Sequence, residues 1–309
     1  MIRYSKCFNI LIDGTVLMKG IWGLTWIPSE ASKAARDKYE ASVVRQLDML
    51  VIRRTGWAVL KEIFYLGKSR GEEVRIVPFT REDEKEMGEE NAFAKPLSRR
   101  AAAPRGVTPY KGGTDNPSTP ADERYRTLSY TGTGEGSSSE VHFSPEKLPL
   151  GPAPLCRRDG TGPSGACRLT PGSDDTPDAT LLHELVHSLR EMRGQLNQVP
   201  TWNKGYDNEE EFFAILVANI YMSEQGKRNL RKDHQSNSKL SEALSTSETF
   251  LGKDASPPSR DHLENRRLVH KFVCQNHTLC AHLSRHVTAA FNPNREFMRN
   301  SQLYPLYSR

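Results

Sequence analysis

The chain has 309 residues, 36% of them hydrophobic, with 43 basic and 38 acidic residues and a net charge of +5 at pH 7. This small charge excess, without aromatic residues interleaved among the basic ones, argues against nucleic-acid binding. No apolar run is long enough to cross a bilayer, and Asp13 interrupts the apolar stretch near the N-terminus, which argues against a cleavable signal peptide.

The first predicted elements are two helices and a strand. Apolar residues recur three or four positions apart across residues 31–65, with a break near Thr55-Gly56, which predicts two consecutive helices. Residues 73–80 are short and β-branched, which predicts a strand.

The composition changes at residue 81. Residues 81–138 are rich in charge, Pro, Gly and Ser, and such a segment buries too little apolar surface to offset its ordering entropy. We therefore predict a flexible polar insertion. Residues 140–145, EVHFSP, predict a strand that ends at its proline, and residues 146–176 predict a loop.

Two helices are predicted next. Thr176 can cap the first, Pro177 suits its first turn, and the helix is expected to stop near Gly194. The second is expected to start at Asn208 and to end at Gly226. Beyond them we predict a Ser-rich linker and then a helical, His-rich segment, residues 235–260 and 261–290 respectively.

The segment LLHELVH places His183 and His187 four residues apart around Glu184. On a helix the two imidazoles share one face and can both reach one zinc ion at about 2.0–2.1 Å. Glu184 points to the neighbouring side, where it would meet a zinc-bound water rather than the metal. This is the HExxH pattern of zinc peptidases.

The pattern also arises by chance on ordinary amphipathic helices. Its surroundings favour a metal, because apolar residues bury the rest of this helix and an unpaired buried polar group costs about 1–3 kcal/mol. The apolar residues are Leu181, Leu182, Leu185, Val186 and Leu189.

A catalytic zinc usually takes three protein ligands and keeps one open position. Arg190 and Arg193 occupy the places of the glycine and the third histidine of a metzincin, so that class is excluded. A glutamate on the following helix remains, and the candidates are Glu209, Glu210 and Glu211. Their alternative role is that of acids at a helix N-terminus behind an Asn cap.

We favour Glu211 as the third ligand, with Glu210 as the runner-up. The face that carries Glu211 continues through Ala214 and Ala218, and such small residues allow a close approach to the HExxH helix.

The pairing of LLHELVH with NEEEFFA resembles the active-site segment of anthrax lethal factor, a gluzincin in which the acid just before the Phe-Phe pair binds zinc. That position is Glu211 here. The wider layout resembles the NleD-type zinc metallopeptidases that bacteria inject as secretion-system effectors. The resemblance covers residues 140–235 and, more loosely, 40–80. It implies a zinc-dependent endopeptidase that acts on a protein or peptide substrate, with secretion machinery as a further partner.

The resemblance also implies a zincin-like α+β fold, with a small mixed sheet, an active-site helix, a Glu-bearing helix and a helical C-terminal region. We expect a soluble protein, cytoplasmic in its producer or secreted as an effector without a cleavable signal. We expect the N-terminal part of the catalytic domain at residues 1–80, the insertion at 81–138 and the zinc peptidase core at 139–234. A linker at 235–260 and the C-terminal region at 261–309 follow.

In the expected mechanism, Glu184 takes a proton from a zinc-bound water and passes it to the leaving amine. The oxyanion needs a further donor. Tyr206 is the first choice, although it is out of register with the helper tyrosine of lethal factor, and His234 is the second. A peptide would add as a strand to a sheet edge, for which residues 140–145 are the expected strand.

Two alternatives stay open. The HExxH segment can belong to a non-catalytic interaction module with a structural or relic zinc. A second metal site can form from Cys274, Cys280, His282 and His286, although their spacing departs from that of a zinc finger.

Overall fold

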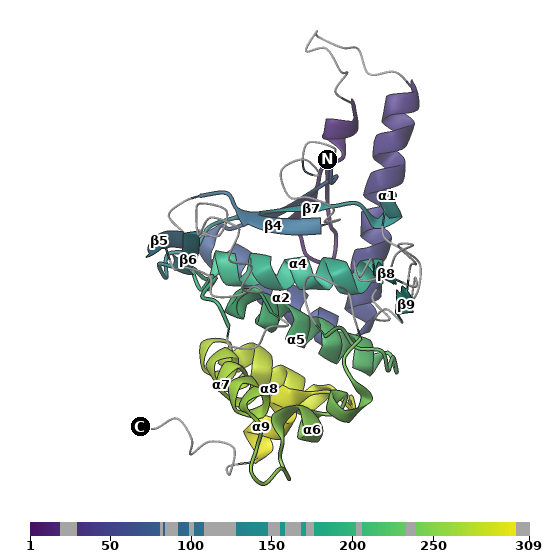
Figure 1. Ribbon diagram of the computed structural model, residues 1–309. Coiled ribbons are helices and arrows are strands. Elements are labelled where there is room, and N and C mark those ends of the chain that lie inside the picture. The colour runs from purple at the N-terminus through teal and green to yellow at the C-terminus, as the bar shows by residue number, and fades with distance from the viewer. Residues whose placement is uncertain are drawn as a thin grey trace, which may run out of the picture.

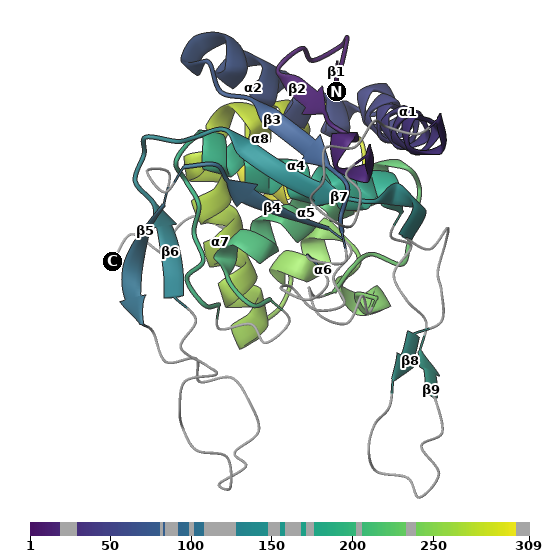
Figure 2. The ribbon, with the colours of Figure 1, turned by 90° about the horizontal axis from the view of Figure 1, so that it is seen from above.

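A computed structural model defines the fold (Figure 1). It describes residues 1–18, 30–80, 83, 92–98, 102–107, 128–147, 155–157, 168–170, 176–201, 206–232 and 239–300. The architecture is α+β, as predicted, with a small mixed sheet covered by helices on one face (Figures 1 and 2).

The sheet has five strands, in the order β1-β2-β3-β7-β4. The three central strands, β2, β3 and β7, are parallel, and β1 and β4 pair antiparallel at the two edges. In this order the strands are Ile2–Arg3, Ile10–Ile12, Val74–Val77, Ser139–Phe143 and Ala92–Pro96.

Two long helices, α1 (Glu30–Ile52) and α2 (Arg54–Arg70), connect β2 to β3. The break between them lies at Arg53, close to the predicted break. Tyr39 on α1 donates to the Phe143 carbonyl of β7 at 3.1 Å. In α2, Ile63 accepts at its carbonyl from the Asn9 amide, which lies just before β2, at 2.9 Å. Both helices are thereby tied to the sheet.

The HExxH helix is α4 (Pro177–Met192), and the Glu-bearing helix is α5 (Glu209–Glu224). Their bounds match the predicted ones. Thr176 lies at the N-cap position of α4 with extended backbone, but its side chain makes no capping hydrogen bond. Asn208 caps α5 as expected, because its side chain accepts from the Glu211 N–H at 3.0 Å.

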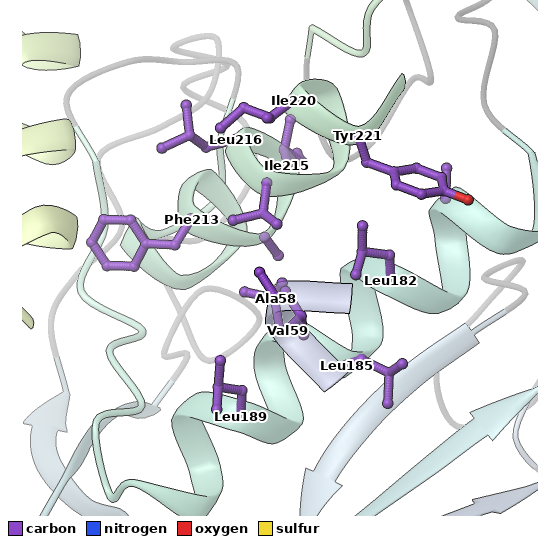
Figure 3. Packing of buried hydrophobic residues seen from close by; sticks show 14 of the residues in the cluster. Ala58, Val59, Leu182, Leu185, Leu189, Phe213, Ile215, Leu216, Ile220 and Tyr221 are labelled. Carbon is purple, nitrogen blue, oxygen red and sulfur yellow. The ribbon is translucent and has the colours of Figure 1, made fainter. Parts of the chain in front are cut away.

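The core is one continuous cluster that runs from the sheet through α4 to α5. Figure 3 shows apolar side chains of α4, Leu182 and Leu185 among them, next to Ala58 of α2 and side chains of α5. Each fully buried side chain of this size contributes about 1.5–3 kcal/mol. Since α4 contacts the sheet on one side and α5 on the other, its polar residues are fixed by core packing.

The last part of the described chain is a group of helices beneath α5 (Figure 1). They are α6 (Ser247–Leu251), α7 (Arg260–Gln275), α8 (His277–His286) and α9 (Pro293–Arg299). Among the residues described, no helix combines the length and the apolar character that a membrane crossing requires.

The strand predicted at residues 140–145 forms, but its expected place at the edge of the sheet is wrong. Residues 140–145 overlap β7, which lies between β3 and β4, so both of its backbone edges are already paired. The edge strand is β4, which comes from within the polar segment 81–138. That segment also contributes the hairpin of β5 (Ala102–Val107) and β6 (Leu128–Gly132), and the loop predicted at 146–176 contains β8 (Leu155–Arg157) and β9 (Arg168–Thr170).

Glycines near the end of this polar segment serve close packing. A Cβ on Gly132 would lie 1.9 Å from the Gly194 carbonyl oxygen, and one on Gly136 would lie 2.1 Å from that of Met192. The Gly132 N–H donates to the Leu196 carbonyl at 2.6 Å. The backbone at the end of β6 and just after it therefore packs directly against the end of α4, and this contact requires residues without side chains.

Candidate metal centre

Three side chains from two helices converge at the interface of α4 and α5. The Nε2 atoms of His183 and His187 lie 3.0 Å apart, and the Glu211 Oε2 atom lies 3.2 Å from the first and 3.5 Å from the second. Ligand atoms at 2.0–2.1 Å from a tetrahedral zinc are about 3.3 Å apart. The three observed separations are close to the edges of such a tetrahedron.

The donor set also fits a metal ion in chemical type. Two imidazole nitrogens and one carboxylate oxygen form a three-ligand set that leaves a fourth position open, as in catalytic zinc sites. The two histidines are buried, and the Glu211 side chain is 16% exposed. His183, His187 and Glu211 can therefore hold a metal ion together.

The electrostatics of the two rings differ. Burial lowers the pKa of His183 to about 3, which keeps this ring neutral, the form that binds metals. Burial also acts to lower the pKa of His187, but the carboxylates of Glu211 and Glu210 outweigh it and raise that pKa well above its ordinary value. His187 thus lies in a strongly negative environment that favours a cation, whether a proton or a metal ion.

Glu210 contacts the opposite side of the His187 ring. Its Oε1 atom lies 3.5 Å from His187 Nδ1, whereas Glu211 approaches Nε2. Burial acts to raise the pKa of the Glu210 carboxyl, but Arg190 and His187 lower it overall. An ionised carboxylate behind a ligating histidine orients the ring and increases its basicity. Glu211 therefore lies beside the two Nε2 atoms, and Glu210 lies behind the His187 ring.

Arg190 holds Glu210 in this position. Its Nε atom donates to both Glu210 oxygens, at 2.8 and 2.9 Å, and its guanidinium lies 4.5 Å from the centre of the Phe213 ring. The Arg190 side chain is fully buried, and the Asn197 N–H also donates to Glu210 at 2.9 Å. The arginine that excludes the metzincin pattern is thus a structural part of the site.

Glu209 points away from the histidines. Arg267 on α7 donates to its Oε1 at 2.8 Å, and Lys271 on α7 and the Asn197 amide both donate to its Oε2. Glu209 is therefore bound to the C-terminal helices and does not reach the cluster of ligand atoms. The three consecutive glutamates have three different sets of partners.

The predicted catalytic residues lie in different surroundings. Glu184 is buried on α4 beside His183, and its charge contributes to the raised pKa of His187. Tyr206 is buried immediately before α5, and its ring packs edge-on against Phe212 with centroids 4.9 Å apart. His234 lies outside the described residues.

Sequence reasoning missed Arg231 near the site. It is buried, and its positive charge contributes to the lowered pKa of His183. Asn219 on α5 fixes its backbone, because the Asn219 side chain donates to the Arg231 carbonyl and accepts from its N–H, both at 2.8 Å. The signal in the sequence was a lone asparagine inside an apolar helix, which needs a partner when buried.

The proposed second metal site does not form. Within the described residues, the only group of three or more metal-binding side chains is that of His183, His187 and Glu211. Cys280 is buried and Cys274 is exposed. The rings of His282 and His286 are neighbours, with centroids 4.7 Å apart on α8.

Comparison with known proteins gives one clear result. A family model named Peptidase_M91 and described as "Effector protein" matches residues 28–247. The matched region begins just before α1, contains all of α4 and α5, and ends at the start of α6. No curated protein shows significant sequence similarity to the chain.

Proposed function

The chain belongs to the Peptidase_M91 effector protein family, and from this premise we propose that it is a zinc-dependent endopeptidase of the gluzincin type. The observation that carries the proposal is the convergence of His183, His187 and Glu211 from two helices, with spacings close to those of a tetrahedral zinc site. The substrate is a protein or peptide.

His183, His187 and Glu211 would hold a zinc ion, which would supply Lewis-acid polarisation of the scissile carbonyl and lower the pKa of water to about 7. Glu184 is the general base and acid: its carboxylate takes the proton of the attacking water and delivers it to the leaving amine. Glu210, held by Arg190, keeps the His187 ring in its ligating orientation.

A donor for the developing oxyanion completes the mechanism. Tyr206 remains our first choice and His234 the second. For Tyr206 the supporting fact is its place immediately before the Glu-bearing turn. Its ring packs edge-on against Phe212. Tyr206→Phe tests this role and is expected to lower kcat while leaving bound zinc unchanged.

The peptide would add as a strand to β4, the antiparallel edge of the sheet next to α4. Strand addition satisfies the backbone groups of an extended peptide and brings one of its peptide bonds alongside the sheet. This replaces residues 140–145 as the docking strand, because both edges of β7 are paired.

The decisive experiment compares wild-type protein with Glu184→Gln on a library of unfolded peptides. Wild type is expected to cleave them, and a chelator should abolish the cleavage. Glu184→Gln should retain zinc and lose about 10²–10⁴-fold in rate. Full activity of the zinc-loaded Glu184→Gln protein would contradict the role of Glu184.

The alternative is a non-catalytic interaction module with a structural zinc. It is favoured if zinc-loaded wild type cleaves nothing in the library while removal of the metal unfolds it. A cleavage-site screen with the purified protein separates the two functions and also identifies the preferred sequence.

A further inference from the structure

The first turn of α5 is held from two sides. On one side, Arg190 and the Asn197 N–H bind Glu210. On the other, Arg267 and Lys271 of α7 bind Glu209, whose side chain is only 3% exposed. Glu211, which faces the two histidines, is the next residue of the same turn.

The arrangement follows from helix geometry. Successive residues of a helix point about 100° apart, so three consecutive glutamates face three directions. Glu209 faces α7, Glu210 faces Arg190, and Glu211 faces the imidazoles. A displacement of this turn toward or away from α7 therefore moves the Glu211 carboxylate relative to both Nε2 atoms.

The other end of α7 contacts Arg190, the residue that binds Glu210. Gln275 accepts from Arg190 Nη1 at 3.2 Å through its side chain, and from the Gln195 side chain at 3.1 Å through its carbonyl. Phe272 of α7 packs on Phe213 of α5, with ring centroids 5.2 Å apart. The helix α7 thus contacts both Glu209, through Arg267 and Lys271, and Arg190, through Gln275.

The two basic residues of α7 are more exposed to water than the carboxylate they bind. Arg267 and Lys271 are about one-third exposed, whereas Glu209 is buried. Removing both cations affects two buried carboxylates, Glu264 and Glu209, and the Asn197 amide is the remaining partner of Glu209 among those described here. The Glu209 carboxylate would then rotate toward water, and this rotation would displace the turn that carries Glu211.

We propose that Arg267 and Lys271 are positioning residues of the metal centre, which act through Glu209 to place Glu211 against the two histidines. The inference rests on the proposed function in one respect, the identity of Glu211 as a ligand. It also assigns a role to α7, which begins at Arg260, beyond the matched region that ends at residue 247.

The test measures zinc affinity of the full chain by competition with a chromophoric chelator, together with the absorption spectrum of the Co²⁺-substituted protein. The Arg267→Met/Lys271→Met double variant is expected to bind zinc about 10–100-fold more weakly, the range that is typical when groups that orient metal ligands are lost. Its Co²⁺ spectrum should also change, because the angle of the carboxylate ligand changes.

The sign of the effect separates positioning from simple electrostatics. Two positive charges are removed near an acidic metal site, so a purely electrostatic effect would tighten zinc binding. Weaker binding therefore supports positioning. Unchanged or tighter binding with an unchanged Co²⁺ spectrum overturns the proposal.

Control variants keep the result interpretable. Lys253→Met removes a cation that pairs with Glu248 and Glu296 elsewhere in the C-terminal helices, and it should leave zinc affinity unchanged. Lys271→Arg should also keep wild-type affinity. If the double variant does not fold, Glu209→Gln removes the same ion pairs from the other side. Loss of the Glu209 charge alone would weaken zinc binding, so for this variant a changed Co²⁺ spectrum supports positioning and an unchanged spectrum overturns it. Failure of wild type to bind zinc would refute the proposed function itself.

Discussion

At the scale of single residues, Glu209, Glu210 and Glu211 illustrate what sequence can and cannot specify. The direction of Glu211 was accessible, because Ala214 and Ala218 mark a face that allows close approach. The role of Glu210 could not be predicted, because it depends on where the Arg190 side chain lies. A buried arginine eighty-five residues away from its partner Gln275 leaves no periodic signal in the sequence.

The buried pair of Arg190 and Glu210 leads to a first prediction. Arg190→Met should lower the free energy of unfolding by about 3–5 kcal/mol, because it leaves the Glu210 carboxylate buried without its cation. The Arg190→Met/Glu210→Gln double variant should lose clearly less than the sum of the two single changes. Urea denaturation of the metal-free proteins measures this, and strictly additive losses would mean that the pair is not coupled.

Glu191 leads to a pH prediction. Burial, with smaller contributions from the Glu210 and Glu184 carboxylates, raises its pKa to about 7 against the opposing effects of Ser139 and His187. The folded state therefore holds this proton more tightly than the unfolded state. Its stabilising contribution is complete below the ordinary pKa near 4.5 and is lost as the pH rises through about 7.

Glu191→Gln should remove this dependence, because the amide oxygen can still accept from the Ser139 hydroxyl, which donates to Glu191 at 2.5 Å. Between pH 5 and 8, metal-free wild type should lose up to about 3 kcal/mol relative to the variant. Chemical denaturation at several pH values measures the difference. Parallel curves for the two proteins would show that Glu191 titrates normally.

At the scale of elements, the helices were predictable and several strands were not. The helices α4 and α5 combine strong apolar patterns with Pro177 and Asn208 at their starts, and their bounds agree within two residues. By contrast, β4 has the sequence AFAKP and lies inside a polar segment. It forms a strand because it pairs with β7 and packs on α4. Such long-range pairing is not recorded in local composition.

The glycines near β6 provide a prediction at this scale. Gly132→Ala should destabilise the protein by about 1–3 kcal/mol, near the upper end, because the new methyl group meets backbone that cannot rotate away. Gly134→Ala is the matched control: it lies two residues away, with positive φ but no atom within 4 Å of the added Cβ. Its cost should be about 1–2 kcal/mol, from backbone strain alone. If Gly134→Ala costs more than Gly132→Ala in thermal unfolding, close packing is not the reason for Gly132.

At the scale of the whole molecule, the C-terminal helices complete the core that the site requires. The helix α5 is apolar nearly all round, which predicted burial without indicating the partner. The partners are α7 and α6. Phe213 packs on Phe272 of α7, and Phe212 stacks on Phe250 of α6 with ring centroids 6.2 Å apart. The sequence therefore predicted that α5 is covered, but not that residues beyond the linker cover it.

A chain that ends at residue 247 should accordingly fail to fold cooperatively, because one side of α5 would be exposed to water. Urea unfolding followed by far-UV circular dichroism compares this fragment with the full chain. A sharp transition with a midpoint equal to that of the full chain would show that the C-terminal helices are dispensable for the fold.

The central claim is that one metal ion is held by His183, His187 and Glu211. Its most direct test is the zinc content of purified wild type, Glu211→Ala and Glu210→Ala, measured by elemental analysis after dialysis. We expect one zinc per chain in wild type, almost none in Glu211→Ala, and weakened but detectable binding in Glu210→Ala. Full zinc content in Glu211→Ala together with its loss in Glu210→Ala would contradict the assignment and move the ligand one residue earlier.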